Sequence, residues 1–224
     1  MGSPQLSPQD VADLVWFCRR LAAALQAGTS LLVALETIAS GATPHQQRYL
    51  ARLRAAVGAG RYLSDALLPQ QQGSLAWKVL RNGEIRNTLP DNLVALADRL
   101  ELEATYPKSP TRLQAYATVF SALGFLLSLR VPMLSALESA AESVPDKGVT
   151  DAFCAARAAM SEGASLAEAM ARLAPDLPSP TLDMIGEAEE DGRLDFALSV
   201  VADYLFDQAE ESAPASHSKE VSHG

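Results

Sequence analysis

The sequence of this chain repeats itself, and this repetition constrains its fold more than any other feature. TSLLVALETIA at 29–39 matches VPMLSALESAA at 131–141, a shift of 102 residues. GRYLSDAL at 60–67 matches GASLAEAM at 163–170, shifted by 103, and GEIRNTLPDNLVALADRL at 83–100 matches AEEDGRLDFALSVVADYL at 188–205, shifted by 105. Three blocks in one order indicate two copies of a single structural unit, with the small changes in shift falling in loops.

Each copy is predicted to be helical. In the first copy, Leu14, Phe17, Leu21 and Leu25 form a stripe at helical spacing that ends at Gly28. We find no alternating strand pattern. The further helices expected in this copy cover 31–40, the stretch from Thr43-Pro44 to Gly60, 63–67, about 74–82, and a last one from about Thr88. The predicted fold class is therefore all-α, with two tandem six-helix antiparallel bundles.

Domain boundaries follow from the repeat and from proline. The bundles are expected at 8–106 and 109–208, and two prolines in ELEATYPKSPTR at 101–112 prevent one continuous helix between them. The last stretch, 209–224, is small, polar and aperiodic, so we expect a disordered tail.

Charge is distributed unevenly along the chain. The net charge of −9 argues against a nucleic-acid partner, because phosphate binding requires a basic surface. Residues 1–106 carry 10 Lys and Arg against 9 Asp and Glu, a net of +1, whereas residues 107–224 carry 8 against 18, a net of −10. The two copies are therefore expected to present different electrostatic faces.

Cysteine usage and hydropathy indicate a cytoplasmic protein. Cys18 and Cys154 lie in apolar helical stretches and are predicted to be free thiols in the core. The polar, acidic N-terminus predicts no signal peptide. The longest uncharged run, between Arg112 and Arg130, is interrupted by polar residues. A membrane span needs about 20 mostly apolar residues, so we interpret this run as a buried core helix.

The repeated blocks resemble the F-type platform domain of type II secretion systems and type IV pilus machines. The residues that carry the resemblance begin with Phe17, Leu21 and Leu25, followed by AG at 27–28 and LVALE at 32–36. GAGRYLSDAL and EGASLAEAM look like the G-x-S-L-x-x-A-L element of the family, and EEDGRLDFALSVVADYL looks like its ending. The resemblance covers nearly all of residues 14–207 in two copies.

This resemblance implies two cytoplasmic six-helix domains joined through membrane segments. It further implies an inner-membrane platform without catalytic residues, which contacts an assembly ATPase and takes part in pilin or pseudopilin assembly. The sequence departs from the family because the membrane segments are missing: Tyr106-Pro107 keeps the pair that often enters the first span, and the second copy follows almost at once. Either a soluble relative lost its spans or the cytoplasmic domains were joined, and both alternatives stay open.

The sequence also shows smaller departures from the family pattern. Asn87 stands where the ending of the motif has glycine, and Ala188 stands where the first copy has Gly83. Arg130-Val131-Pro132 replaces Gly28-Thr29-Ser30 in the second copy.

The acidic segment EAEEDG at 187–192 begins like a calcium loop. Counted as an EF-hand loop, its acids fall on positions one, three and five and its glycine on position six: Glu187, Glu189, Asp191 and Gly192. Position twelve requires a bidentate glutamate but is Leu198. We therefore interpret the segment as a helix–turn–helix corner with positive φ at Gly192, and weak divalent-ion binding is the alternative.

Catalytic motifs are not recognised. The histidines are His45, His217 and His223, two of them in the expected tail, and His45 is predicted to be solvated. No His/Cys/Asp cluster has metal-ligand spacing, and no phosphate-cradling loop is present. GTS at 28–30 and GAS at 163–165 do not complete a nucleophile turn. We therefore expect no catalytic, cofactor or metal site.

One basic face is the candidate partner site. Arg48 and Arg52 lie one helical turn apart, with Arg54 nearby, and form either an ordinary solvated face or a docking surface for an acidic partner. The expected function is a non-enzymatic cytoplasmic scaffold or adaptor, peripheral to the inner membrane through its partners. By resemblance its partner is a secretion or pilus ATPase, with weak self-association through the charge asymmetry. The alternative is a stand-alone helical binding module.

Overall fold

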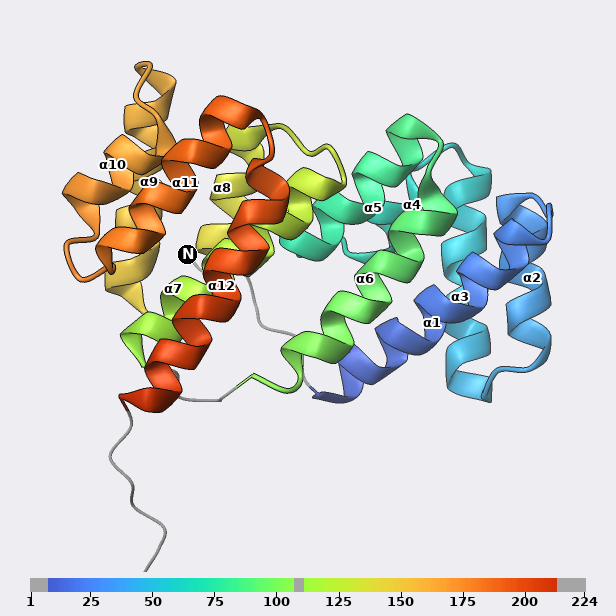
Figure 1. Cartoon of the computed structure of the whole chain (residues 1–224). Helices are drawn as coiled ribbons and strands as arrows, with labels where there is room; N and C mark the ends of the chain where they lie inside the picture. Colours follow the sequence, from blue (N-terminus) through green and yellow to red (C-terminus); the bar gives the residue numbers. More distant parts are fainter. Residues whose placement is uncertain (1–7, 107–110, 213–224) are drawn as a thin grey trace, which may run out of the picture.

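The structure, a computed structural model, describes residues 8–106 and 111–212, and every regular element in these ranges is an α-helix (Figure 1). The first copy of the repeat forms α1 (Pro8–Gln26), α2 (Leu31–Ser40), α3 (Pro44–Gly58), α4 (Leu63–Leu67), α5 (Leu75–Arg86) and α6 (Leu89–Glu103). The second copy forms α7 (Arg112–Ser128), α8 (Met133–Ala141), α9 (Lys147–Ser161), α10 (Leu166–Leu173), α11 (Ser179–Asp191) and α12 (Leu194–Glu211). The prediction of an all-α fold with two six-helix bundles is confirmed.

Several helices begin at side-chain caps that are visible in the sequence. The hydroxyl of the first residue accepts the backbone N–H of the third helical residue, whose own side chain accepts the N–H of the first. Such capping boxes open α3, α7 and α10 at Thr43–Gln46, Thr111–Gln114 and Ser165–Glu168. The serine of the GAS stretch is therefore a helix cap.

Each bundle is closed by packing its first helix against its last. α1 lies against α6 in the first copy, and α7 lies against α12 in the second. The other helices contact their neighbours in chain order, so no helix is exchanged between the copies. Figure 1 shows the result: α1 to α6 form one half of the molecule and α7 to α12 the other.

The two copies turn with the same backbone conformation even where their residues differ. Asn87 and Gly192 end α5 and α11, with φ of 60° and 68°. Gly28 and Arg130 follow α1 and α7, with φ of 84° and 62°. Asparagine tolerates the left-handed region, but arginine adopts it only at a cost in free energy. The fold therefore keeps the turn after α7 despite an unfavourable residue.

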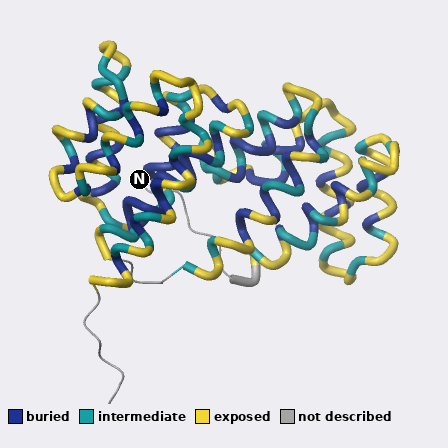
Figure 2. Tube along the Cα trace, viewed as in Figure 1, coloured by how far each residue is buried: buried dark blue, intermediate teal, exposed yellow. Residues whose placement is uncertain are grey.

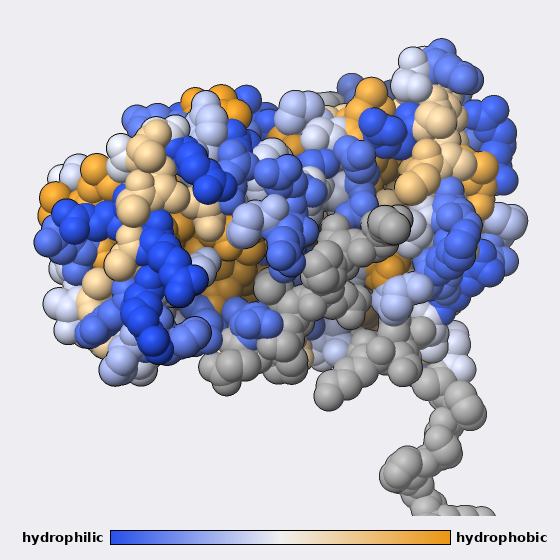
Figure 3. All heavy atoms as spheres, turned by 180° about the vertical axis from the view of Figure 1, so that it is seen from behind, coloured by the Kyte–Doolittle hydropathy of each residue, from blue (hydrophilic) through white to orange (hydrophobic). Residues whose placement is uncertain are grey.

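The core runs along the inner faces of the helices (Figure 2). The most deeply buried helix is α7, which is enclosed on most of its surface and not along one stripe. This confirms that the uncharged run between Arg112 and Arg130 is a core helix. Within the described residues, no helix is long and apolar enough to cross a membrane. On the face seen in Figure 3, hydrophobic residues reach the surface in separate patches between hydrophilic ones, as is usual for protein surfaces.

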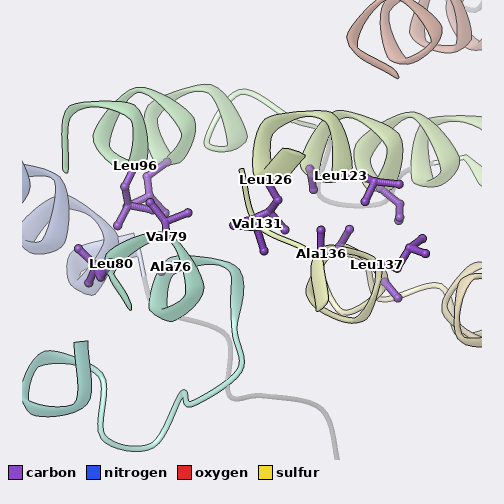
Figure 4. Close-up of a cluster of buried hydrophobic side chains, with 14 of the residues drawn as sticks. Ala76, Val79, Leu80, Leu96, Leu123, Leu126, Val131, Ala136 and Leu137 are labelled. Carbon is purple, nitrogen blue, oxygen red and sulfur yellow. The ribbon is translucent and has the colours of Figure 1, made fainter. Parts of the chain in front are cut away.

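The two bundles are joined by contacts of α5 with α7 and α8. Asn82 donates a hydrogen bond from its side-chain amide to the carbonyl oxygen of Leu129, and Ser139 donates one to the carbonyl oxygen of Gly73. Buried side chains continue across this junction, and Figure 4 shows Val79 and Val131 on its two sides. The copies thus share one continuous hydrophobic core although each closes its own ring of helices.

Three sequence-based expectations need correction. Cys18 is fully buried, but Cys154 is exposed, because α9 turns Phe153 and Ala156 to the core and leaves Cys154 between them outside. The fifth helix extends beyond 82 to Arg86. The last helix continues to Glu211, so 209–211 are helical and not part of a tail. Residues 213–224 of the expected tail, with His217 and His223, lie outside the described residues, as do the two prolines at 107 and 110.

Candidate interaction surfaces

The predicted basic face lies on α3, a helix that contains no acidic residue. Arg48 and Arg52 are exposed, and neither forms an ion pair within the described parts of the chain. Arg54 is also exposed but is held by Glu36 of α2, with 3.0 Å between guanidinium and carboxylate. The structure therefore divides the three arginines: two are exposed without an ion-pair partner among the described residues, and one pairs with a carboxylate of α2.

The acidic corner has a structural role that the sequence did not show. The carboxylate of Glu189 on α11 accepts the backbone N–H groups of Leu166 and Ala167 at 2.7 and 3.0 Å. These are the first N–H groups of α10, which have no partner inside that helix. Glu189 therefore caps a neighbouring helix at the end where negative charge is favoured.

The first copy contains the same arrangement. Glu84 on α5 accepts the backbone N–H groups of Leu63 and Ser64 at the start of α4, and the Ser64 hydroxyl at 2.6 Å. Glu84 and Glu189 occupy matching positions of the repeat. The glutamate that recurs at this position of both copies thus has the same capping role in each.

The remaining acids of the corner face solvent. Glu187, Glu190 and Asp191 are exposed, and Asp191 pairs with Arg193 at 2.7 Å. Gly192 has positive φ, as the helix–turn–helix interpretation requires. Among the described residues, no three His, Cys, Asp or Glu side chains are grouped so that they can hold a metal ion.

A cleft of about 360 Å³ opens between the start of α1, the start of α3 and the segment after α4. Its floor is apolar and buried, formed by Leu14, Phe17, Leu50, Leu67 and Leu68. Concave apolar sites with a few polar groups at the edge are the usual form of a binding site. No sequence pattern marks this cleft, because its walls come from three separate segments of the chain.

The rim of this cleft is aromatic and acidic. Trp16 and the 41% exposed Tyr49 flank it, and the Tyr49 hydroxyl donates to the carbonyl oxygen of Leu67 at 3.0 Å. Asp10 and Asp13 lie on the α1 side, and Asp13 accepts a hydrogen bond from the amide of Gln46 at 3.3 Å. His45 is exposed on α3, as predicted, and lines the cleft. Trp16 and Asp13 lie on α1 outside its apolar stripe. An aromatic residue off the stripe is the sequence feature that could have indicated this rim.

A second cleft lies at the junction of the copies, between α6, α7 and α12. Arg99 lines it and is almost completely buried, donating to Glu103 at 2.7 Å and to Ser121 at 2.6 Å. Phe196 stands on its edge with 70% of its surface exposed. Arg99 therefore links α6 to α7 as part of the bundle junction.

The fold and these surfaces define a duplicated helical-bundle protein whose candidate sites are exposed faces and clefts. The family model for protein F of the type II secretion system matches residues 17–106 and 119–214, once for each copy. The chain belongs to this family, and the resemblance seen in the repeated blocks is confirmed. It is 32% identical over 96 residues to the type IV pilus assembly protein PilC of Myxococcus xanthus (strain DK1622). That match covers 43% of this chain and 23% of PilC.

Proposed function

We propose that this chain is a non-enzymatic scaffold of a secretion or pilus assembly machine that works through protein contacts in the cytoplasm. The observation that carries the proposal is that both copies belong to the protein F family of type II secretion, together with the similarity to a pilus assembly protein. The partner that the family resemblance implies is the assembly ATPase of the same organism.

The solvent-facing arginines of α3 are the proposed docking surface. Arg48 and Arg52 carry charge that no described residue neutralises, and the matching positions of the second copy, shifted by 103, are Asp151 and Ala155. The first copy thus has a basic face that the second copy lacks. Complementary charge across an interface mainly increases the association rate and selects the partner.

Binding of the purified full chain to the ATPase tests this proposal. Arg48→Glu combined with Arg52→Glu should reduce binding about tenfold or more, because two exposed charges are reversed at the proposed contact. Arg20→Glu combined with Arg86→Glu is the matched control, since it reverses two exposed arginines on other helices of the same copy. Equal loss in both variants would mean that net charge, and not the α3 face, determines binding.

The same face is proposed to mediate weak self-association with the acidic second copy of another molecule. Charge attraction between exposed groups is screened beyond about 8 Å at physiological salt, so association should fade as salt rises. Sedimentation across a salt series measures this. A monomer at every salt concentration that also fails to bind the ATPase would leave the stand-alone binding module as the function.

A further inference from the structure

The two copies of the repeat have side chains of different size and charge at the cleft between α1 and α3. The turns that follow α1 and α7 lie at Gly28 and Arg130, so residues of α1 match residues of α7 that are 102 positions later. The starts of α3 and α9 are 103 positions apart, so these two helices are matched with a shift of 103. Leu14 then corresponds to Tyr116 and Leu50 to Phe153. The second copy therefore shows what the same location looks like with larger side chains.

In the second copy this location is filled. Tyr116 and Phe153 are fully buried and their rings lie 6.2 Å apart, while Phe120 packs edge-on against Phe153 at 5.2 Å. At the surface above them, Arg112 pairs with Asp176 of the segment after α10 at 3.3 Å. Aromatic rings beneath an arginine thus close the second copy.

In the first copy both aromatic positions are leucines, and the cleft is open above them. The position that matches Arg112 is Asp10, so the rim charge is reversed. Asp13, one turn further along α1, is exposed, and no cation of the described residues pairs with it. At the compared positions the first copy therefore lacks three groups that fill the second copy: the rings of Tyr116 and Phe153 and the guanidinium group of Arg112.

We propose, on the basis of the protein-binding function above, that this cleft binds a partner segment in which an aromatic side chain adjoins an arginine. The ring would rest on Leu14, Phe17 and Leu50, which leaves the guanidinium group near the carboxylates of the rim. Trp16 and Tyr49 beside the cleft also offer ring faces that attract a cation. Aromatic and arginine side chains are the usual anchors of protein interfaces, and a cleft of about 360 Å³ suits one such pair.

The test uses blocked dipeptides as probes and Trp16 as the reporter. The chain has two tryptophans, so Trp77→Phe in the full chain leaves Trp16 as the single indole fluorophore. Acetyl-Phe-Arg-amide should change the Trp16 emission with roughly millimolar affinity, since so small a contact gains little binding free energy. Acetyl-Phe-Glu-amide should bind at least about tenfold more weakly, because its charge is repelled by the rim.

Two variants locate the contact. Asp13→Asn should weaken the arginine probe about two- to fivefold, the range for an exposed ion pair. Asp183→Asn is the matched control, an exposed aspartate of the second copy, and should leave affinity unchanged.

Leu14→Tyr combined with Leu50→Phe installs the rings of the second copy and should abolish binding. If that double variant does not fold, Asp13→Lys, which changes an exposed residue, should abolish binding of the arginine probe instead.

Equal binding of both probes, or no response of Trp16 up to about 10 mM of the arginine probe, would overturn the proposal. The ATPase measurement separates this from failure of the proposed function. Probe binding without ATPase binding would reject only the identity of the partner, whereas ATPase binding without probe binding would reject only the cleft.

Discussion

The ammonium group of Lys78, on α5 of the first copy, donates a hydrogen bond to the carbonyl oxygen of Ser135, on α8 of the second copy, at 2.6 Å. Its side chain is only 9% exposed, and burial lowers its pKa, while Glu138, 3.4 Å away, partly compensates. A desolvated cation at the junction costs free energy unless it is paired and hydrogen-bonded. The junction therefore depends on a few specific polar contacts in addition to apolar packing.

Residues 1–106 expressed alone should fold and unfold cooperatively, because α1 to α6 close their own ring of helices. The fragment should be less stable than the same helices in the full chain, since separation exposes apolar side chains of α5 at the junction. Urea unfolding followed by circular dichroism measures both. If this fragment and residues 107–224 are both molten while the full chain is folded, the copies are not separate folding units.

Gly83→Ala should destabilise the protein by about 1–3 kcal/mol, as expected for an overpacked core. A Cβ at this position would lie 2.9 Å from the Cβ of Asn92 and 3.0 Å from the Cα of Leu89. The second copy has Ala188 and Ala197 at the positions of Gly83 and Asn92. A larger residue at the first position is thus accompanied by a smaller residue at the second.

Asn92→Ala should rescue part of the loss from Gly83→Ala, because it removes the Asn92 Cγ, which would lie 3.0 Å from the added Cβ, and leaves the Cβ contact in place. Alone, Asn92→Ala removes a buried hydrogen bond to the carbonyl oxygen of Val79 and should cost about 1 kcal/mol. A double-mutant cycle from denaturant unfolding should give a coupling of at least about 0.5 kcal/mol. Strict additivity of the two losses would contradict the proposed steric contact.

Glu189→Gln should reduce stability by about 1–3 kcal/mol without any metal present, because one oxygen that accepts an N–H of α10 is replaced by a donor. Glu190→Gln, an exposed neighbour, is the control and should change stability by less than about 0.5 kcal/mol. Calorimetry should detect no tight calcium or magnesium binding. Sub-micromolar affinity that is lost in Glu189→Gln would show that the corner is an ion site.

The two thiols should react at very different rates with a thiol reagent under native conditions. Cys154 is exposed on α9 and should be modified at once, whereas Cys18 is fully buried and should react only on unfolding. Mass spectrometry of the modified chain identifies the site. Two equally fast thiols would mean that α1 opens readily from the bundle.

Burial also raises the pKa of Cys18 to about 12 from the ordinary 9.0. Below pH 9.0 the thiol is protonated in both the folded and the unfolded chain. Between pH 9.0 and about 12 the unfolded chain loses the proton, whereas the folded chain keeps it. The stabilising contribution is therefore complete below 9.0 and is lost as the pH rises toward about 12, by at most about 1.4 kcal/mol for each pH unit. Cys18→Ala should flatten this part of the curve of stability against pH relative to the parent chain.

The sequence by itself determined the duplication, the number of helices and most of their starts. These features depend on local interactions: apolar spacing, hydroxyl caps such as Thr43, and residues such as Asn87 that allow a left-handed turn. Because each involves residues only a few positions apart, they can be derived without knowing how the helices pack.

Only the tertiary structure decided the role of Glu189, the exposure of Cys154 and the existence of the α1–α3 cleft. Glu189 became a cap because α10, which starts 23 residues earlier, presents its N–H groups to α11. Cys154 adjoins Phe153 in an alanine-rich helix, and the packing of α9 turns Phe153 and Ala156 to the core and Cys154 to solvent. The cleft depends on whether Leu14 and Leu50, from different helices, fill the space that Tyr116 and Phe153 fill in the second copy. Such outcomes depend on volumes and orientations contributed by segments distant in the sequence, which local patterns do not encode.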